Sequence, residues 1–557
     1  MLEGLDLGQI QEEQARELII RLLNLIEGLS ADLREAQQEN QRLRDEIARL
    51  KGEKGKPQIK PNAGSGNRNY SSERERKKPQ DPHSESKTPK QERLRIDREE
   101  TLKVDPALLP EDAQFKGYED VLVQELILRT DNVLYHKEKF YSPSQQKTFL
   151  AEMPPGYQGQ FGPQLKVFIW VLYFAVQVSE PKIVELLKVA GISISGAEVS
   201  NLLIKEQERL HQEKAEIVQA GLESSPWQQR DDTGTRVKGV NEHCHILCNP
   251  LYTAFSTLEK KDRQSVIDVL SNHQPRRYLF NEHVLEYLQK RQVSQNLIEQ
   301  VAQLEATEML DEEGFEQAIR GKLGTLSEQH QKRIKDGARV AAYQAQAEGP
   351  VVKLLLCDDA GQSKAITEEV ALCWVHDGRH YKKLMPVCEP HQKLLAEFRG
   401  HYWDYYRELL KYKENPTKEE AVGLEQRFDE LFGTKTGYEA LDERIAKTHE
   451  KKAGLLAVLR PPEVPLHNNA SELGARARVR KRAVSLGPRT EEGVRAWDTG
   501  MTIVETAKKL GISVYEYLKD RLSGAKQMPS LAQIIREKAN QLHLGASWNS
   551  NPVPPNF

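Results

Sequence analysis

The sequence lacks the features of a secreted or membrane-spanning chain. It has 5 cysteines in 557 residues, too few for a disulfide scaffold and typical of a protein in a reducing cytosol. Its longest apolar stretch, residues 167–178, is shorter than the roughly 20 residues needed to cross a bilayer. Residues 1–6 are acidic and lack the basic and apolar segments of a signal peptide. These absences predict a cytoplasmic protein with no membrane partner.

The chain also has little net charge and no excess of glycine or proline. Its 80 Lys and Arg residues against 83 Asp and Glu residues leave a net charge of −3, so any binding of nucleic acid must use local patches. The 35 glycines and 27 prolines are close to average, which excludes a fibrous or wholly disordered chain. At roughly 100–200 residues per domain, the length predicts three or four modules.

A heptad repeat runs through residues 15–50. The d positions are Leu22, Leu29, Ala36, Leu43 and Leu50, and the a positions are Ile26, Leu33, Asn40 and Ile47. A single Asn at a, among Leu and Ile neighbours, favours a parallel two-stranded coiled coil in one register. We therefore expect residues 1–52 to form a homodimer or higher oligomer. The alternative is a long amphipathic helix that packs on its own protein, which would not need the strict 3.5-residue period.

The next two segments differ in composition. Residues 53–115 are rich in Pro, Ser, Gly and Asn, and they predict a flexible, mildly basic linker. Residues 116–224 have a helical pattern. Within them, a helix ending near Gly191 and a helix starting at Gly196 have the outline of a helix-turn-helix DNA-binding unit, although any pair of adjacent helices shares that outline.

From residue 225 the hydrophobic period changes from 3.6 toward 2. The pattern predicts strands at 227–237, 242–248 and 252–258, a helix at 262–270, and two buried strands at 351–357 and 370–375. The expected fold is therefore an α/β core with large helical insertions. Its parts are core segments 225–280 and 349–380, helical insertions 281–348 and 381–465, C-terminal core helices 466–525, and a tail 526–557.

Three acidic positions in this core could carry chemistry. Asp231 lies on the first strand, Asp358 closes the apolar strand 351–357, and Glu472 lies one turn into a helix that begins near residue 468. Carboxylates of this kind suit Mg²⁺ or Mn²⁺, and two such ions about 4 Å apart promote phosphodiester cleavage. Asp232 and Asp359 are adjacent and should point to the opposite face. A register displaced by one residue would make them the ligands instead.

Four short segments occur in a fixed order around these acids: residues 231–234 (Asp-Asp-Thr-Gly), 357–360 (Cys-Asp-Asp-Ala), 373–379 (Cys-Trp-Val-His-Asp-Gly-Arg) and 467–472 (His-Asn-Asn-Ala-Ser-Glu). In this order they resemble the DDE transposases of bacterial insertion sequences, and look most like insertion-sequence family sixty-six, over about residues 116–525. The resemblance implies an RNase H-like catalytic core in which Asp231, Asp358 and Glu472 are the catalytic acids and hold two Mg²⁺ or Mn²⁺ ions. It also implies that His376, Arg379 and Asn469 lie near the site.

The chain departs from the common pattern of that family in three places. Residues 100–160 contain no Cys, where many relatives carry a zinc module. The family's usual Asp-Asn-Asn motif before the third acid begins with His467 here. Leu473 follows Glu472 at the position where the family usually has an Arg. An alternative role for Cys373 and His376 is to bind a structural zinc ion, although two ligands do not complete such a site.

A basic cluster follows Glu472 directly. It consists of Arg476, Arg478, Arg480, Lys481 and Arg482. Because no acid intervenes to pair with these cations, we expect them to hold DNA phosphates beside the active site. The alternative is a solvated helix face.

These inferences converge on a DNA transposase associated with the bacterial nucleoid. It would bind double-stranded DNA at the element ends and in the target, and would catalyse two-metal cleavage and strand transfer. The alternatives are a non-catalytic dimeric DNA-binding regulator, a decayed transposase, and a metal-dependent nuclease without strand transfer. Related elements often encode helper proteins, but nothing in this chain requires one.

Overall fold

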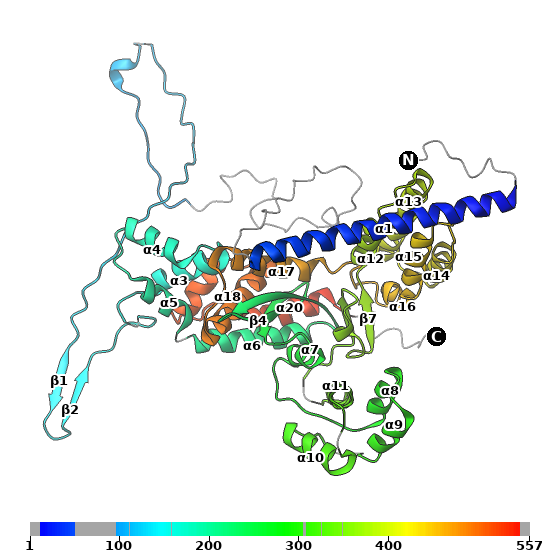
Figure 1. The fold of residues 1–557 in the computed structure, drawn as a ribbon. Helices are drawn as coiled ribbons and strands as arrows, with labels where there is room; N and C mark the ends of the chain where they lie inside the picture. The colour runs from blue at the N-terminus through cyan, green and yellow to red at the C-terminus, as the bar shows by residue number, and fades with distance from the viewer. Residues whose placement is uncertain are drawn as a thin grey trace. The chain divides into compact units, whose positions relative to one another are not determined.

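The chain is largely helical and of mixed α/β class, and it contains a mixed five-stranded sheet (Figure 1). The structure, a computed structural model, describes residues 12–50 and 96–545, except residues 111, 158, 206, 305–307, 325 and 348. Most of the predicted linker and the end of the predicted tail lie outside the described residues. One unit contains the described residues of 12–50, 204–510 and 527–545, and the other contains the described residues of 96–203 and residues 511–526.

The sheet has the order β5-β4-β3-β6-β7. Its strands are β3 (Trp227–Val237), β4 (Val240–Asn249), β5 (Tyr252–Leu258), β6 (Leu354–Cys357) and β7 (Glu369–Leu372). β3, β4 and β5 form an antiparallel meander, whereas β6 and β7 continue the sheet in parallel from β3. The five strands predicted from the periodicity are therefore present. The last two are shorter than predicted: β6 begins at Leu354, and β7 ends at Leu372 because helix α12 begins at Trp374.

Helices surround this sheet. They are α6 (Glu208–Glu223), α7 (Arg263–Leu270), α17 (Asn469–Ser485), α18 (Glu491–Leu510) and α20 (Leu531–Leu542). α18 covers the edge strand β5: the backbone N–H groups of Thr253, Phe255 and Thr257 donate to side-chain oxygens of that helix. These backbone N–H groups would otherwise be free to pair with a strand of another chain, and the hydrogen bonds to α18 prevent that. The prediction of a tail from residue 526 was wrong in part, since α20 is a helix with four buried apolar residues.

Each helical insertion has its own hydrophobic core. The first contains α8 (Glu282–Lys290), α9 (Gln295–Ala302), α10 (Glu312–Leu323) and α11 (Glu328–Ala345). The second contains α12 (Trp374–Lys383), α13 (Glu389–Glu414), α14 (Lys418–Phe432), α15 (Glu439–His449), α16 (Lys452–Leu455) and η6 (Ala457–Leu459). Trp374 is fully buried in the second core, among three tyrosines and two phenylalanines. Because each insertion buries apolar surface by itself, it need not disturb the sheet.

The second unit is less helical than predicted. It contains η3 (Pro106–Leu108), β1 (Lys139–Ser142), β2 (Lys147–Leu150), α3 (Pro163–Trp170), η4 (Val171–Ala175), α4 (Glu180–Val189), α5 (Gly196–Ile204) and α19 (Val514–Leu522). The helical prediction for 116–160 was wrong: the described residues there form no helix, and residues 139–150 form the β1–β2 hairpin. α4 and α5 are separated by a turn in which Gly191 has a φ of 82°, a conformation that favours glycine. The predicted helix-turn-helix outline is thus present as two helices, and its contact with DNA stays a prediction.

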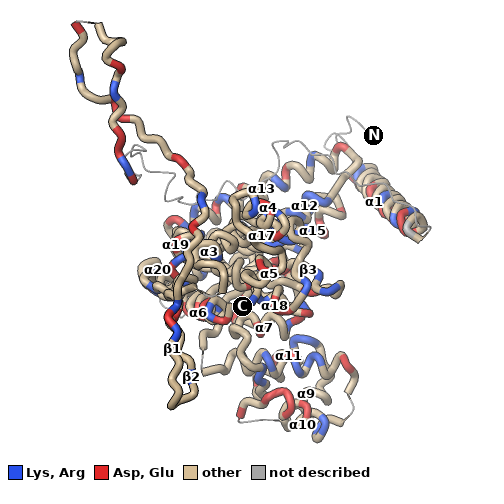
Figure 2. Tube along the Cα trace, turned by 90° about the vertical axis from the view of Figure 1, so that its left-hand side faces the viewer, with Lys and Arg blue, Asp and Glu red and all other residues tan. Residues whose placement is uncertain are grey.

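α1 (Glu13–Leu50) is one continuous helix, along which acidic and basic residues are interspersed (Figures 1 and 2). It contacts its own chain through Leu23, Asn24 and Glu27. The heptad residues lie elsewhere on the helix: Leu29 and Leu33 are 61% and 60% exposed, and Leu22, Leu43, Ile47 and Leu50 are also exposed. The helix therefore packs on its own protein and still presents the apolar seam. No described helix is long and apolar enough to cross a membrane.

The exposed seam leads to a prediction about assembly. Replacing Leu29 and Leu43 together with Glu should lower the mass of the full-length protein in light scattering to that of one chain, because both residues are at d positions of the coiled coil. Leu25→Glu is the matched control. Leu25 is 59% exposed on the same helix but falls at g, where a Glu is tolerated. An oligomer that survives the double substitution would show that the seam is not the dimer contact.

Candidate active site

Asp231 and Asp358 lie on neighbouring parallel strands. The backbone register pairs Trp227 with Leu354 and Gln229 with Leu356. Continued by two residues, this register sets Asp231 level with Asp358, which directly follows the last residue of β6. Both carboxylates are half-buried, and neither forms an ion pair with a Lys or Arg among the described residues. The polar contact of Asp231 is with the N–H of the next residue, which donates to its Oδ1 at 2.8 Å.

The adjacent acids are paired with cations. Asp232 accepts a hydrogen bond from the buried guanidinium of Arg230 at 2.9 Å. Asp359 lies 2.6 Å from the ammonium nitrogens of both Lys364 and Lys451. Asp232 and Asp359 each have a cation within 2.9 Å, whereas Asp231 and Asp358 have none among the described residues. The geometry thus favours the predicted register over the one displaced by a residue.

The third acid, Glu472, comes from the first turn of α17. This helix packs on β3 and β4, and the side chain of Asn468, just before it, donates to the carbonyl of Arg230 at 2.7 Å. Gly474 permits the close approach, because a Cβ there would lie 2.8 Å from the side chain of Ile246. The strand residue that precedes Asp231 is therefore tied to the helix that carries Glu472.

Three cationic or titratable groups hold the Glu472 carboxylate. Arg379 and His376, both on α12, approach it at 3.2 Å and 3.5 Å, and Arg476 approaches from the next turn of α17 at 3.4 Å. Burial lowers the pKa of His376, although the negative charge of Glu472 opposes that change. The predicted near-site residues His376 and Arg379 are thus brought to Glu472. Asn469 is buried at the start of the helix, where its N–H faces His467.

Burial is the largest influence on the ionisation of Asp231. Together with the negative charges of Asp358, Asp232 and Glu472, it raises the pKa of Asp231 to about 7, against the opposing hydrogen bond from the Asp232 N–H. Asp358 and Glu472 are therefore close enough to Asp231 to repel its charge. A bound divalent cation would relieve the repulsion, so the carboxylate set fits Mg²⁺ or Mn²⁺.

Cys373 is brought to the same place. Its sulfur, a nitrogen of His376 and an oxygen of Glu472 all lie within 4.8 Å of one another. The sequence supplied two ligands for the zinc alternative, and Glu472 is a third. However, the Cys373 sulfur accepts the Asn468 N–H at 3.2 Å. This contact favours a structural role for Cys373, at the junction of α12 and α17.

The prediction that five cations after Glu472 all face DNA was wrong for two of them. Arg478 and Lys481 are fully buried, and both stack on Trp497. Arg478 forms an ion pair with Asp498 of α18 at 3.3 Å. The spacing of the two residues in the sequence does not indicate this pairing. Arg476 and Arg480 are exposed, and Arg482 donates to the carbonyl of Gly234. The positive charge offered to solvent by α17 is therefore smaller than predicted.

The sequence analysis did not predict a role for Asn468. Its amide side chain is fully buried and links α17 to β3, whereas only the neighbouring Asn469 was predicted to lie near the site. Its position immediately before the helix that carries Glu472 could have indicated this role. A helix start on a sheet needs a polar group that can reach the strand backbone.

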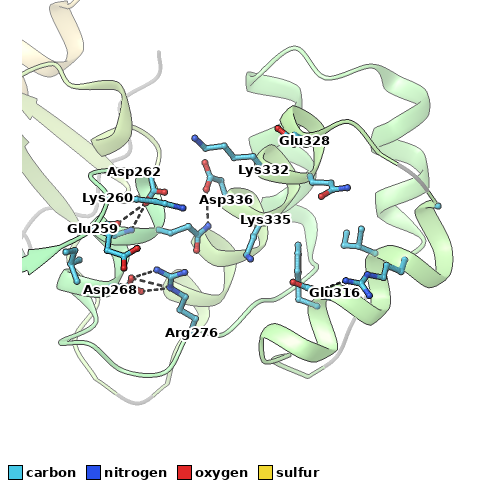
Figure 3. A pocket seen from close by; sticks show the side chains of 18 residues that line it. Glu259, Lys260, Asp262, Asp268, Arg276, Glu316, Glu328, Lys332, Lys335 and Asp336 are labelled. Atoms are coloured by element: carbon cyan, nitrogen blue, oxygen red, sulfur yellow. Dashed lines mark hydrogen bonds and ion pairs between the residues drawn. The ribbon is translucent and has the colours of Figure 1, made fainter. Parts of the chain in front are cut away.

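A separate cavity of ≈ 840 Å³ lies between the end of β5, α7 and the first helical insertion (Figure 3). It contains none of the three acids discussed above. Its charges are mixed and paired: Arg276 contacts Asp268 at 2.7 Å, and Gln264 donates to Asp336 at 2.9 Å. Arg263 also pairs with Asp336 at 3.0 Å. The cavity therefore marks a polar junction between insertion and core rather than a site with one sign of charge.

Comparison with known proteins gives one informative relative. No protein-family model matches the chain. A stretch of 325 residues, 58% of this chain, is 32% identical to the uncharacterized protein y4jO of Sinorhizobium fredii (strain NBRC 101917 / NGR234) over its entire length. The chain belongs to the y4jO family. Because that protein is uncharacterized, membership of the y4jO family assigns no activity.

The buried Arg478–Asp498 pair yields a prediction about stability. Arg478→Gln should lower the free energy of unfolding in urea by about 3–5 kcal/mol, because it leaves the buried Asp498 carboxylate without its cation. Arg480→Gln on the same helix should change stability by no more than about 0.5 kcal/mol, since that side chain is exposed. Equal stability of the two variants would contradict the burial of Arg478.

The raised pKa of Asp231 predicts a pH dependence in the absence of metal. The folded protein holds the Asp231 proton more tightly than the unfolded chain does, because the pKa of an aspartate carboxyl in an unfolded chain has its ordinary value of 3.8. The free energy of unfolding should therefore decrease as pH rises from about 4 to about 7, and Asp231→Asn should remove roughly 2–4 kcal/mol of that decrease. Urea titrations at several pH values measure the effect.

Asp359→Asn is the control for this titration. Burial opposes ionisation of Asp359, but Lys364 and Lys451 outweigh it and lower its pKa. Its stabilising contribution is lost only as pH falls toward and below about 4. The pH slope between 4 and 7 should therefore persist in this variant. A slope that is unchanged by Asp231→Asn would place the proton on another group.

Proposed function

We propose that this protein is a DNA transposase with an RNase H-like catalytic core. The single observation that carries the proposal is the approach of three acids from distant parts of the chain. Asp231 on β3 and Asp358 after β6 share one register, and the charges of Asp358 and Glu472 both raise the pKa of Asp231. These are the acids that the resemblance to insertion-sequence transposases implies as catalytic.

The topology of the sheet supports the same proposal. In the order β5-β4-β3-β6-β7, β4 alone runs antiparallel to the other four strands. A mixed sheet of this kind, with helices against it and an acid on the central strand, is what an RNase H-like core requires. The two helical insertions enter after the first part of the sheet and after β7, so they leave the strand order intact.

The carboxylates of Asp231, Asp358 and Glu472 would hold the divalent ions. Two bound Mg²⁺ or Mn²⁺ ions supply an activated oxygen nucleophile and stabilise the leaving oxygen of a phosphodiester. Asp231 must lose its proton to serve as a ligand, so binding should strengthen as pH rises toward its pKa of about 7. Arg379 and Arg476 fix the direction of the Glu472 carboxylate.

DNA is the proposed partner, and beside the three acids its contacts would be to the phosphate backbone. Arg480 and Arg476 are exposed on α17, the helix that carries Glu472, so they can contact phosphates that flank the scissile bond. The α4–α5 pair is the proposed element-end reader. The exposed seam of α1 would pair two copies, which would allow one assembly to hold two DNA ends.

Two alternatives differ in a measurable way. A dimeric DNA-binding regulator or a decayed transposase would not need three interacting acids, and a neutral residue at any of the three would serve it equally well. A metal-dependent nuclease would use the same acids to cut DNA but would not join the cut end to a second duplex. The separation of cleavage from joining therefore decides between a nuclease and a transposase.

A strand-transfer assay tests the proposal. The full-length protein is mixed with Mg²⁺, a target plasmid and duplexes taken from both sides of its own coding sequence, each labelled at the 5′ end of the strand that is to be joined. Wild type should cut the labelled duplex and join the new 3′ end to the plasmid. Asp231→Asn, Asp358→Asn and Glu472→Gln should each abolish both reactions, a loss of at least about 10³-fold, because each removes a ligand charge and keeps the side-chain shape.

The matched controls are Asp232→Asn and Asp359→Asn. These acids pair with lysines or arginine and are not proposed ligands, so their variants should retain cleavage and joining. Activity lost in Asp359→Asn but kept in Asp358→Asn would move the second ligand by one residue. Cleavage without joining would favour the nuclease, and DNA binding with neither reaction would favour the regulator.

A further inference from the structure

A second cluster of metal-ligand side chains lies away from the acidic site. It joins Glu27 of α1 to Cys388 and His391, which lie at the start of α13. One carboxylate oxygen, the sulfur and one ring nitrogen all lie within 4.8 Å of one another, and all three residues are buried. None of these side chains takes part in the proposed transposase chemistry.

We propose that Glu27, Cys388 and His391 bind a zinc ion that fastens the N-terminal helix to the second helical insertion. Cys388 and His391 are three residues apart at a helix start, so both side chains reach the same end of α13. Thiolate, imidazole and carboxylate are the ligand types that zinc takes in proteins. A thiolate is a poor ligand for Mg²⁺, so this site differs in metal from the acidic one.

The distances suit a tetrahedral ion after a small closure. Zinc bonds of about 2.0–2.3 Å place neighbouring ligand atoms roughly 3.3–3.8 Å apart. The His391 Nδ1 and the Glu27 Oε1 are already 3.4 Å apart. The His391 ring is stacked on Tyr438, with centroids 4.3 Å apart, and this contact holds the ring in the orientation that presents Nδ1. Water would supply the fourth ligand.

Charge balance also favours an ion. The buried Glu27 carboxylate accepts the N–H groups of Val387 at 2.9 Å and Cys388 at 2.8 Å, and no Lys or Arg of the described chain forms an ion pair with it. A carboxylate and a thiolate together neutralise a dication. The alternative is that Glu27 serves only as a cap for the start of α13. Such a cap requires neither a cysteine nor a histidine in the cluster.

Metal analysis of the full-length protein tests the proposal. The protein is produced in zinc-supplemented medium, dialysed, and analysed for bound metal. Wild type should retain about one zinc per chain at this site, and Cys388→Ser or His391→Asn should lose it. Replacement of zinc by cobalt should give a thiolate-to-metal absorption band in the wild-type protein. This measurement does not depend on whether the variants fold. Wild type without stoichiometric zinc, or cobalt without that band, would overturn the proposal.

Cys373→Ser is the matched control, because Cys373 lies in the other cysteine–histidine–glutamate cluster. It should keep the zinc. Loss of zinc in Cys373→Ser together with retention in Cys388→Ser would assign the ion to that other cluster and overturn the proposal. The outcome is independent of strand transfer, since Glu27, Cys388 and His391 are not among the acids that the transposase proposal requires.

Discussion

The docking of α17 on the sheet is the constraint on which the candidate site depends. Glu472 is more than a hundred residues from Asp358 in sequence, and it reaches the other acids only because its helix begins against β3. The hydrogen bond from Asn468 to the Arg230 carbonyl sets where the helix starts, and the missing side chain of Gly474 sets how closely it lies on Ile246. Arg478 then anchors its far side to Asp498 of α18. Polar contacts thus determine the position of the helix, and apolar packing fills the space around them.

The insertions enlarge the protein without altering this arrangement. Each has its own buried core, so most of its apolar side chains are buried without help from the sheet. Arg263 pairs with Asp336 of the first insertion, and Ala457 of the second insertion packs in a cluster with Leu354 of the sheet. The second insertion also supplies Arg379 and His376 to Glu472, because α12 begins directly after β7. An insertion that extends a core strand can therefore contribute side chains to the site at the strand end.

The sequence predicted the strands well, for a physical reason. Alternation and buried apolar runs are local patterns, so β3 to β6 could be located within a few residues, and Asp358 stood out as a charge that closes an apolar strand. Long-range pairing has no such local pattern. The run of cations after Glu472 looked unpaired, yet Asp498 and Trp497 from α18 bury two of them. The segment before β1 was wrongly predicted to be helical, because most of its large apolar residues, such as Phe115, Val121 and Leu126, are exposed and do not form a buried face.

We propose that Asp231, Asp358 and Glu472 together hold divalent cations. Anomalous diffraction from crystals of the full-length protein soaked in Mn²⁺ at a pH above 7 tests this metal site most directly. We expect manganese bound by the carboxylates of Asp231 and Asp358, with Glu472 beside it, and none at Asp232 or Asp359. Manganese bound by Asp232 or Asp359, or a site that stays free of manganese at saturating concentration, would contradict it.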